Sequence, residues 1–236
     1  MNHANVQPTR GAAPRGNVVV GAPGRSRRTG RAEETRELIL AVAERLFAQH
    51  GVVAISNRQI SDAAGQGNNT AVGYHFGTKT DLVRAIVARH SEQIEELRRQ
   101  LLDRQDGGWA ARDWVACLVR PVTDHLASLG GPTWYARFLA QVLTDPALRR
   151  IVIDDALTAP PMQATIDGLS RSLPDLPQPV QAERNDMARN LIVHTCAERE
   201  RAIVDGTSLP GTTWESTATG LIDAIVGLLL APVTRT

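Results

Sequence analysis

Residues 56–82 read SNRQISDAAGQGNNTAVGYHFGTKTDL, and this stretch decides the fold of the first third of the chain. Ser56 is a good N-cap for a short helix. Two glycines then interrupt the helical pattern, and Asn68 is placed to cap a second short helix that runs towards His75. Two short helices joined by a glycine-containing turn predict a helix-turn-helix unit at about residues 56–76.

Helical periodicity continues on both sides of this unit. From Glu33 to Gly51 apolar residues recur every three or four positions, and Thr78 caps a long helix downstream. Beyond that helix the sequence shows helical periods alone, broken by glycine and proline, at residues 109–129, 133–143, 146–173, 179–204 and 213–230. The sequence therefore predicts an all-α fold of about nine helices.

The formal net charge of +1 conceals a division of charge along the chain. Residues 1–90 contain 12 Lys+Arg and 6 Asp+Glu, whereas residues 91–236 contain 14 and 19. A basic first part on an acidic remainder predicts a polyanionic partner for the first part. Residues 1–32 have no acidic side chain and six arginines, the composition of a flexible basic arm. An inert tail is the alternative for residues 1–22.

Several function classes find no support in the sequence. Cys117 and Cys196 lie far apart without a metal-binding spacing, which argues against a zinc site or a disulfide framework. We find no nucleophile–base pair, phosphate-binding glycine loop or carboxylate cluster, and expect no catalytic residue, metal or cofactor. The best membrane candidate, Gly220–Val233, is too short to span a bilayer and contains Asp223. No secretory signal is present, so we expect a cytoplasmic protein without a membrane partner.

The stretch from Ser56 to Gly65, followed by VGYHFGTKTDL at residues 72–82, resembles the N-terminal domain of tetracycline-repressor-like (TetR) regulators. The resemblance covers about Glu33–His90. It departs from the family pattern in a turn that is one residue longer after Gly65. A second departure is Gly73, which stands where the family often has a tyrosine that contacts phosphate.

The resemblance implies three parts of the chain. Residues 1–32 are expected to form the arm, residues 33–90 a helix-turn-helix DNA-binding domain, and residues 91–236 a helical ligand-binding and dimerisation domain. The expected partners are double-stranded DNA with a near-palindromic operator, a small-molecule effector and a second copy of the chain. Such a protein would be cytoplasmic and nucleoid-associated.

Side-chain chemistry and the resemblance together give the expected DNA contacts. Asn69 and Thr70 suit base edges in the major groove. Asn57 and Arg58, at the start of a helix, suit backbone phosphates, and Lys79 resembles the phosphate-binding lysine of the family. The full set of expected DNA-binding residues is Arg27, Arg28, Asn57, Arg58, Asn68, Asn69, Thr70, Gly73, Tyr74, His75, Thr78 and Lys79.

Residues 221–230 of the last helix form a wide apolar stripe with Asp223 as its one charge. Such a helix is buried either inside its own domain or against a second subunit, and the resemblance implies a dimer core. The expected interface residues are Leu221, Ile222, Ile225, Val226 and Leu229. For each expected ligand-binding residue, ordinary core packing is the alternative. These residues are Trp114, Cys117, Leu118, Phe138, Met162, Ile166, Met187, Leu191 and His194.

We therefore expect a DNA-binding transcriptional regulator, a repressor that a small molecule releases from its operator. The alternatives are a constitutive or architectural DNA-binding regulator without a ligand, and a helical enzyme with a basic arm. The enzyme hypothesis lacks any recognisable catalytic constellation in the sequence. The presence or absence of an enclosed cavity in the C-terminal part distinguishes the first two.

Overall fold

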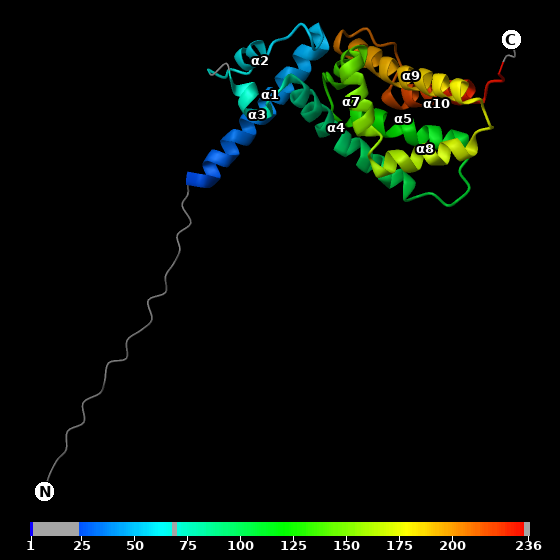
Figure 1. Cartoon of the computed structure of the whole chain (residues 1–236), viewed down its shortest axis with the longest axis horizontal. Coiled ribbons are helices and arrows are strands. Elements are labelled where there is room, and N and C mark those ends of the chain that lie inside the picture. The colour runs from blue at the N-terminus through cyan, green and yellow to red at the C-terminus, as the bar shows by residue number, and fades with distance from the viewer. Residues whose placement is uncertain (2–23, 68–69, 234–236) are drawn as a thin grey trace. The chain divides into compact units, whose positions relative to one another are not determined.

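The computed structural model describes Met1, residues 24–67 and residues 70–233, with residues 24–29 described by their backbone alone. These residues form ten α-helices and no strand, which confirms the all-α prediction (Figure 1). The expected segment 146–173 is two helices rather than one, because Pro160 and Pro161 fit only the first turn of a new helix. The helices are α1 (Gly24–His50), α2 (Asn57–Ala63), α3 (Ala71–Phe76), α4 (Lys79–Leu102), α5 (Ala111–Ser128), α6 (Tyr135–Thr144), α7 (Pro146–Ala156), α8 (Pro160–Ser172), α9 (Gln178–Val204) and α10 (Trp214–Leu230).

Helix α1 begins at Gly24, nine residues before the expected start at Glu33. Arginine and alanine, both strong helix formers, make up five of the residues 24–32, and no proline interrupts them. The last nine residues of the expected arm are therefore helical. Residues 2–23 lie outside the described part of the chain.

The described chain divides into two units, residues 1–35 and residues 36–236. Within the second unit, α4 runs without interruption across the expected domain boundary at residue 90. The region expected to bind DNA and the C-terminal region therefore share one helix. Phe47, Ile60 and Val72 are fully buried, whereas Phe76 is half-buried at the edge of the same core.

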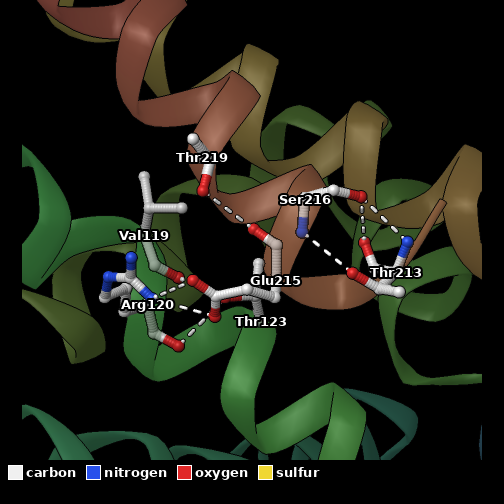
Figure 2. Close-up of polar contacts among 7 residues, drawn as sticks. All are labelled: Val119, Arg120, Thr123, Thr213, Glu215, Ser216 and Thr219. Atoms are coloured by element: carbon white, nitrogen blue, oxygen red, sulfur yellow. Dashed lines mark hydrogen bonds and ion pairs between the residues drawn. The ribbon is translucent and has the colours of Figure 1, made fainter. Parts of the chain in front are cut away.

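Helix α10 packs against α5 and α9, and polar contacts fix its first turn (Figure 2). The Thr213 N–H donates to Ser216 Oγ at 2.8 Å, and the Ser216 N–H donates to Thr213 Oγ1 at 3.0 Å. Glu215 accepts hydrogen bonds from Arg120 Nη1 of α5 on both carboxylate oxygens, each at 3.0 Å. The capping pair begins the helix, and the ion pair attaches it to α5.

A proline inside α5 explains the burial of an arginine on α4. Pro121 has no N–H, so the Cys117 carbonyl four residues earlier loses its helical donor. The guanidinium of Arg98, a residue only 1% exposed, donates to that carbonyl through Nη1. Arg98 Nε donates to Glu95 Oε1 at 3.1 Å, which balances the buried charge. Arg98 thus takes the place of the hydrogen bond that the proline removes.

The start of α6 is capped by a carboxylate from another helix. Glu200 of α9 is 1% exposed and accepts four hydrogen bonds at this point. Two come from the backbone N–H groups of Ala136 and Arg137, one from Arg137 Nε at 3.1 Å, and one from the Thr133 hydroxyl at 2.6 Å. A carboxylate is favoured at a helix N-terminus, and these donors satisfy its buried oxygens.

Candidate nucleic-acid interface

The start of α2 forms the first part of the candidate interface. Ser56 Oγ accepts from the Gln59 N–H at 3.2 Å, and Gln59 Oε1 accepts from the Ser56 N–H at 2.8 Å, which confirms the predicted N-cap. The Arg58 side chain is 75% exposed, with Asp62 at 3.7 Å. An exposed ion pair of this kind is weak, so the guanidinium is available for an anion. Asn57 is half-buried, and its Oδ1 has no hydrogen-bond partner among the described residues.

Helix α3 begins after Thr70, not after Asn68 as the sequence suggested. Its first helical hydrogen bond runs from the Tyr74 N–H to the Thr70 carbonyl at 2.9 Å. The helix is therefore shorter at its N-terminal end than we predicted. Asn68 and Asn69 lie outside the described residues.

The two faces of α3 differ in burial. Ala71 and Val72 are buried against α2 and α4, whereas Gly73 and Tyr74 face solvent, and Tyr74 is 84% exposed. His75 is half-buried, with its ring edge-on to the Tyr74 ring at 5.1 Å between centroids. A side chain at Gly73 would meet open space within the described part of the chain, so the glycine leaves the backbone of α3 accessible.

The start of α4 lies next in the chain and brings the expected lysine to the same region. Thr78 caps the helix: its Oγ1 accepts from the Asp81 N–H at 3.1 Å, and Asp81 Oδ2 accepts from the Thr78 N–H at 3.1 Å. The hydrogen bonds from Thr78 lower the pKa of the Asp81 carboxyl. Lys79 Nζ donates to the Val52 carbonyl at 3.1 Å, a contact that the sequence did not reveal. An ammonium has three N–H donors, so this bond leaves two for phosphate oxygens.

Arg36 is a second neighbour that we did not predict. Its guanidinium lies over the Phe76 ring at 5.2 Å from the centroid, a cation–π contact between α1 and α3. The side chains of Arg27 and Arg28 lie outside the described residues, although both positions belong to the helical backbone of α1.

The residues expected to bind a ligand do not come together as one group. Trp114 and Cys117 are buried at the contact of α5 with α8, where Cys117 Sγ lies 3.4 Å from Thr165 Oγ1. Phe138 instead stacks on Phe47 of α1, with centroids 6.2 Å apart. Leu118, Met162 and Ile166 are half-buried. Three residues of α9 are exposed, because α9 packs against α10 with its opposite face: Met187, Leu191 and His194.

A cleft of about 300 Å³ occurs elsewhere, between the end of α1 and the helices α6 and α9. None of the expected ligand-binding residues lines it. Its lining consists of Ala48, Gln49, Trp134, Arg137, Arg201, Val204 and Asp205.

The expected dimer interface requires correction. Four of its five residues are buried within the chain's own core, because α10 lies against both α5 and α9, and Val226 is half-buried. The exposed residues of α10 include the small residues Gly220, Ala224 and Gly227, the polar residues Thr219 and Asp223, and Leu230, which is 49% exposed. The residues that face inward are Leu221, Ile222, Ile225 and Leu229.

Within the described residues, no group of three or more His, Cys, Asp or Glu side chains could hold a metal ion. The helices of that same part of the chain include none with the length and hydropathy needed to cross a bilayer.

A short helix with an exposed face, supported by a second helix and followed by a capped third, is the arrangement of a helix-turn-helix DNA-binding protein. Comparison with known families agrees with this class. Residues 39–86 match the family described as bacterial regulatory proteins, tetR family, and residues 116–227 match the tetracyclin repressor-like C-terminal domain. These matches together cover more than half of the chain, and it belongs to the TetR family of transcriptional regulators.

Individual relatives show the same pattern. The HTH-type transcriptional regulator AcrR of Shigella flexneri is 44% identical over 66 residues, which are 28% of this chain and 30% of that protein. The match thus spans less than a third of that relative's length. A TetR family regulator from Marinobacter aquaeolei VT8 has a TM-score of 0.55 at 17% identity, over 83% of this chain and 97% of its own. AmtR of Mycobacterium smegmatis gives 0.53 at 22% identity, over 80% and 85%. These structures share the fold. Members of the family are transcription factors, not enzymes, that bind DNA operators, form dimers and bind small molecules.

Proposed function

We propose that this regulator is a homodimeric repressor that binds a near-palindromic operator through α3 and is released by a small molecule. The observation that carries the proposal is the exposed face of α3, where Gly73 and Tyr74 face solvent while Ala71 and Val72 pack inward. A helix held in this way can enter a major groove without loss of core packing. Two copies related by a two-fold axis require half-sites about one helical turn apart, roughly 34–36 Å, or somewhat more.

The proposed contacts divide by chemistry. Asn69 and Thr70, which precede α3 in the sequence, read base edges beside Asn68, and Gly73 lets the backbone approach the DNA. The remaining residues bind backbone phosphates and set the register without reading sequence. These are Arg27, Arg28, Asn57, Arg58, Tyr74, His75, Thr78 and Lys79.

The test is the selection of bound fragments from the source genome by the purified protein, followed by binding of variants to the selected operator. Asn69→Ala should cost ~1–3 kcal/mol on that operator and relax selectivity at one base pair per half-site. Lys79→Ala should weaken binding to all sequences similarly and lower the salt slope by about one charge per subunit. Arg150→Ala, whose side chain is 85% exposed on α7, is the matched control for the loss of one positive charge.

Two results would contradict the proposed register. One is a change of base preference in Lys79→Ala with none in Asn69→Ala. The other is an Arg150→Ala salt slope that falls as far as that of Lys79→Ala, because the effect of Lys79 would then be net charge alone.

The proposed dimer is formed through the outward faces of α9 and α10. Met187 and Leu191 on α9 are 43% and 38% exposed, and Leu230 adds to the exposed apolar surface of α10. The small side chains of the outer face of α10 allow close approach of a second helix. Leu191→Arg should yield monomers in sedimentation at micromolar concentration with an unchanged helical spectrum, and a stable wild-type monomer would refute the dimer.

A ligand-independent regulator is the second candidate, and one contact favours it. The Trp114 ring lies so close to Gly168 of α8 that a methyl group there would overlap it, so this part of the interior is filled. Genes beside the selected operators indicate which compounds to test. Release of the operator by one of them supports the repressor, whereas binding unchanged by all of them supports the ligand-independent regulator.

A further inference from the structure

The cleft of about 300 Å³ lies where the end of α1 meets the start of α6 and the end of α9. Its volume suits a small metabolite. The cleft is separate from the contact of α5 with α8, where the Trp114 ring fills the interior. The polar and aromatic side chains that line it are Gln49, Trp134, Arg137, Arg201 and Asp205.

Arg137 is a charged donor that the fold holds in place. The residue is 8% exposed, and its Nε donates to Glu200 Oε2 at 3.1 Å while its Nη2 donates to the Thr133 carbonyl at 2.8 Å. Its guanidinium also lies over the Trp134 ring, 4.2 Å from the centroid. Nη1 has no hydrogen-bond partner in the described chain and remains accessible. A guanidinium fixed in this way can bind an anionic oxygen with little further loss of side-chain freedom.

Arg201 adds a second guanidinium from α9. Its Nη1 donates to Glu198 Oε1 at 2.7 Å, and the two side chains are 50% and 68% exposed. An exposed ion pair of this kind is weak, and a guanidinium has five N–H donors. Arg201 can therefore bind a ligand while it keeps this contact. Two planar guanidinium groups on one cleft suit a carboxylate.

Asp205 gives the same cleft a negative group. It follows Arg201 by four residues and is exposed, and its carboxylate has neither an ion pair nor a hydrogen bond in the described chain. A ligand with negative charge alone would be repelled by this carboxylate, and Glu200 already balances Arg137. A ligand with both a carboxylate and an ammonium group meets an opposite charge at each end. The lining therefore favours a zwitterion.

The rest of the lining is suited to an apolar group. Ala48 and Val204 present aliphatic surface, and the half-buried Trp134 adds an aromatic ring. Gln49 is exposed, and its amide has no hydrogen-bond partner in the described chain, so it can bind either end of a zwitterion. A molecule with an apolar body and one zwitterionic end matches these surfaces.

We propose that this cleft binds a free α-amino acid with an apolar side chain, with its carboxylate at Arg137 and Arg201 and its ammonium group at Asp205. The bound molecule contacts α1 on one side and α6 and α9 on the other. It therefore joins the region matched by the N-terminal family model to the C-terminal helices, and it is the effector that releases the operator. This effector role rests on the proposed function, whereas the binding itself does not.

The first experiment measures binding of the common L-amino acids to the full chain by isothermal titration calorimetry, without DNA and up to millimolar concentration. At least one amino acid with an apolar side chain should bind. Its analogue without the carboxylate should bind about tenfold more weakly, and its analogue without the ammonium group about threefold more weakly. Binding by none of the amino acids would overturn the proposal, and so would equal affinity for the amino acid and both analogues.

Charge variants test the assigned contacts. Arg201→Gln should lower the preference for the amino acid over its amine analogue by about threefold, and Asp205→Asn should abolish the preference over its acid analogue. Arg150→Gln and Asp154→Asn are the matched controls, because they neutralise exposed charges on α7, and they should keep both preferences. A change that merely loosens the fold weakens all three ligands alike and leaves the preferences unchanged. Unchanged preferences in both cleft variants would overturn the assigned contacts.

The effector role is tested on the protein bound to its operator. The amino acid that binds in calorimetry should release the operator over the concentrations that fill the cleft, and Asp205→Asn should require more of it. An amino acid that binds but leaves operator affinity unchanged would overturn the effector role. Failure of the wild type to bind any operator refutes the proposed function instead, because the calorimetric result does not depend on DNA.

Discussion

The contact of Arg98 with the Cys117 carbonyl of α5 predicts that substitutions at Arg98 and Pro121 have coupled effects on stability. Replacing Arg98 by methionine keeps most of the aliphatic stem but removes the donor to the Cys117 carbonyl. Replacing Pro121 by alanine supplies a backbone N–H that can donate to the same carbonyl. Arg98→Met should therefore be costly in the wild type and much less costly when residue 121 is alanine.

The magnitude follows from the groups left behind. A hydrogen bond from a charged donor contributes ~1.5–3 kcal/mol, and an unsatisfied buried carbonyl costs ~1–3 kcal/mol, two descriptions that partly overlap. Glu95 loses its ion-pair partner too, which adds to the cost, because its Oε2 is already buried without a hydrogen-bond partner among the described residues. We expect a loss of ~3 kcal/mol for Arg98→Met and a coupling of ~1–2 kcal/mol with Pro121→Ala.

The assay is urea unfolding of the four proteins of the cycle at fixed pH and fixed protomer concentration, because dimerisation contributes to apparent stability. Pro179→Ala is the matched control: Pro179 lies in the first turn of α9, where its missing N–H deprives no helical carbonyl. That change should show no coupling to Arg98→Met. A coupling near zero with Pro121→Ala, or one equally large with Pro179→Ala, would refute the substitution of Arg98 for the missing N–H.

Three further variants test other buried contacts. Gly168→Ala should lower stability by ~1–3 kcal/mol and change the near-ultraviolet circular dichroism, since the new methyl group displaces the Trp114 ring. Glu200→Gln should cost ~3 kcal/mol in urea unfolding, because Arg137 stays buried without its charge partner. Acid unfolding should show a stability loss of ~3 kcal/mol between pH 6.5 and about 4, where the unfolded chain protonates His125 and the folded chain does not. His125→Leu should lack this loss.

The DNA-binding region was predictable because its signals are local. Ser56 and Thr78 are N-cap residues, and each exchanges hydrogen bonds with the residue three positions later, so the sequence alone indicated where α2 and α4 begin. The start of α3 was not predictable, because Asn68 and Thr70 are both good N-cap residues and the turn is one residue longer than in the family. The hydrogen bond of Lys79 with the Val52 carbonyl joins residues 27 positions apart, so no local sequence pattern could predict it.

The C-terminal region was predictable as helices but not as surfaces. An apolar stripe such as that of α10 shows that a face is covered, and it does not distinguish coverage by the same chain from coverage by a second copy. Leu221 and Ile225 therefore agreed with a dimer interface until the structure placed them against α5 and α9. Met187 and Leu191 show the converse, since apolar residues at helical spacing were interpreted as interior and are exposed.

The buried polar residues are the largest group that the sequence did not reveal, although one signal for them was present in α4. Leu82, Ile86, His90, Ile94 and Arg98 follow one another at intervals of four, so His90 and Arg98 occupy positions of an otherwise apolar face. Polar residues at such positions indicate either a tolerated exposure or a buried partner. The structure shows the second: each of the two is at most 5% exposed and hydrogen-bonded.

These two residues also specify how α4 lies on α5. His90 meets His125 and Arg98 meets the Cys117 carbonyl, so a step of eight residues along α4 corresponds to eight residues in the opposite direction along α5. Apolar side chains between antiparallel helices pack nearly as well after a shift by one turn, whereas a shift here would leave a buried imidazole and a buried guanidinium without partners. The polar pairs therefore select one register of α4. Because α4 begins at Lys79 beside α3, that register also determines where α3 lies relative to the C-terminal helices.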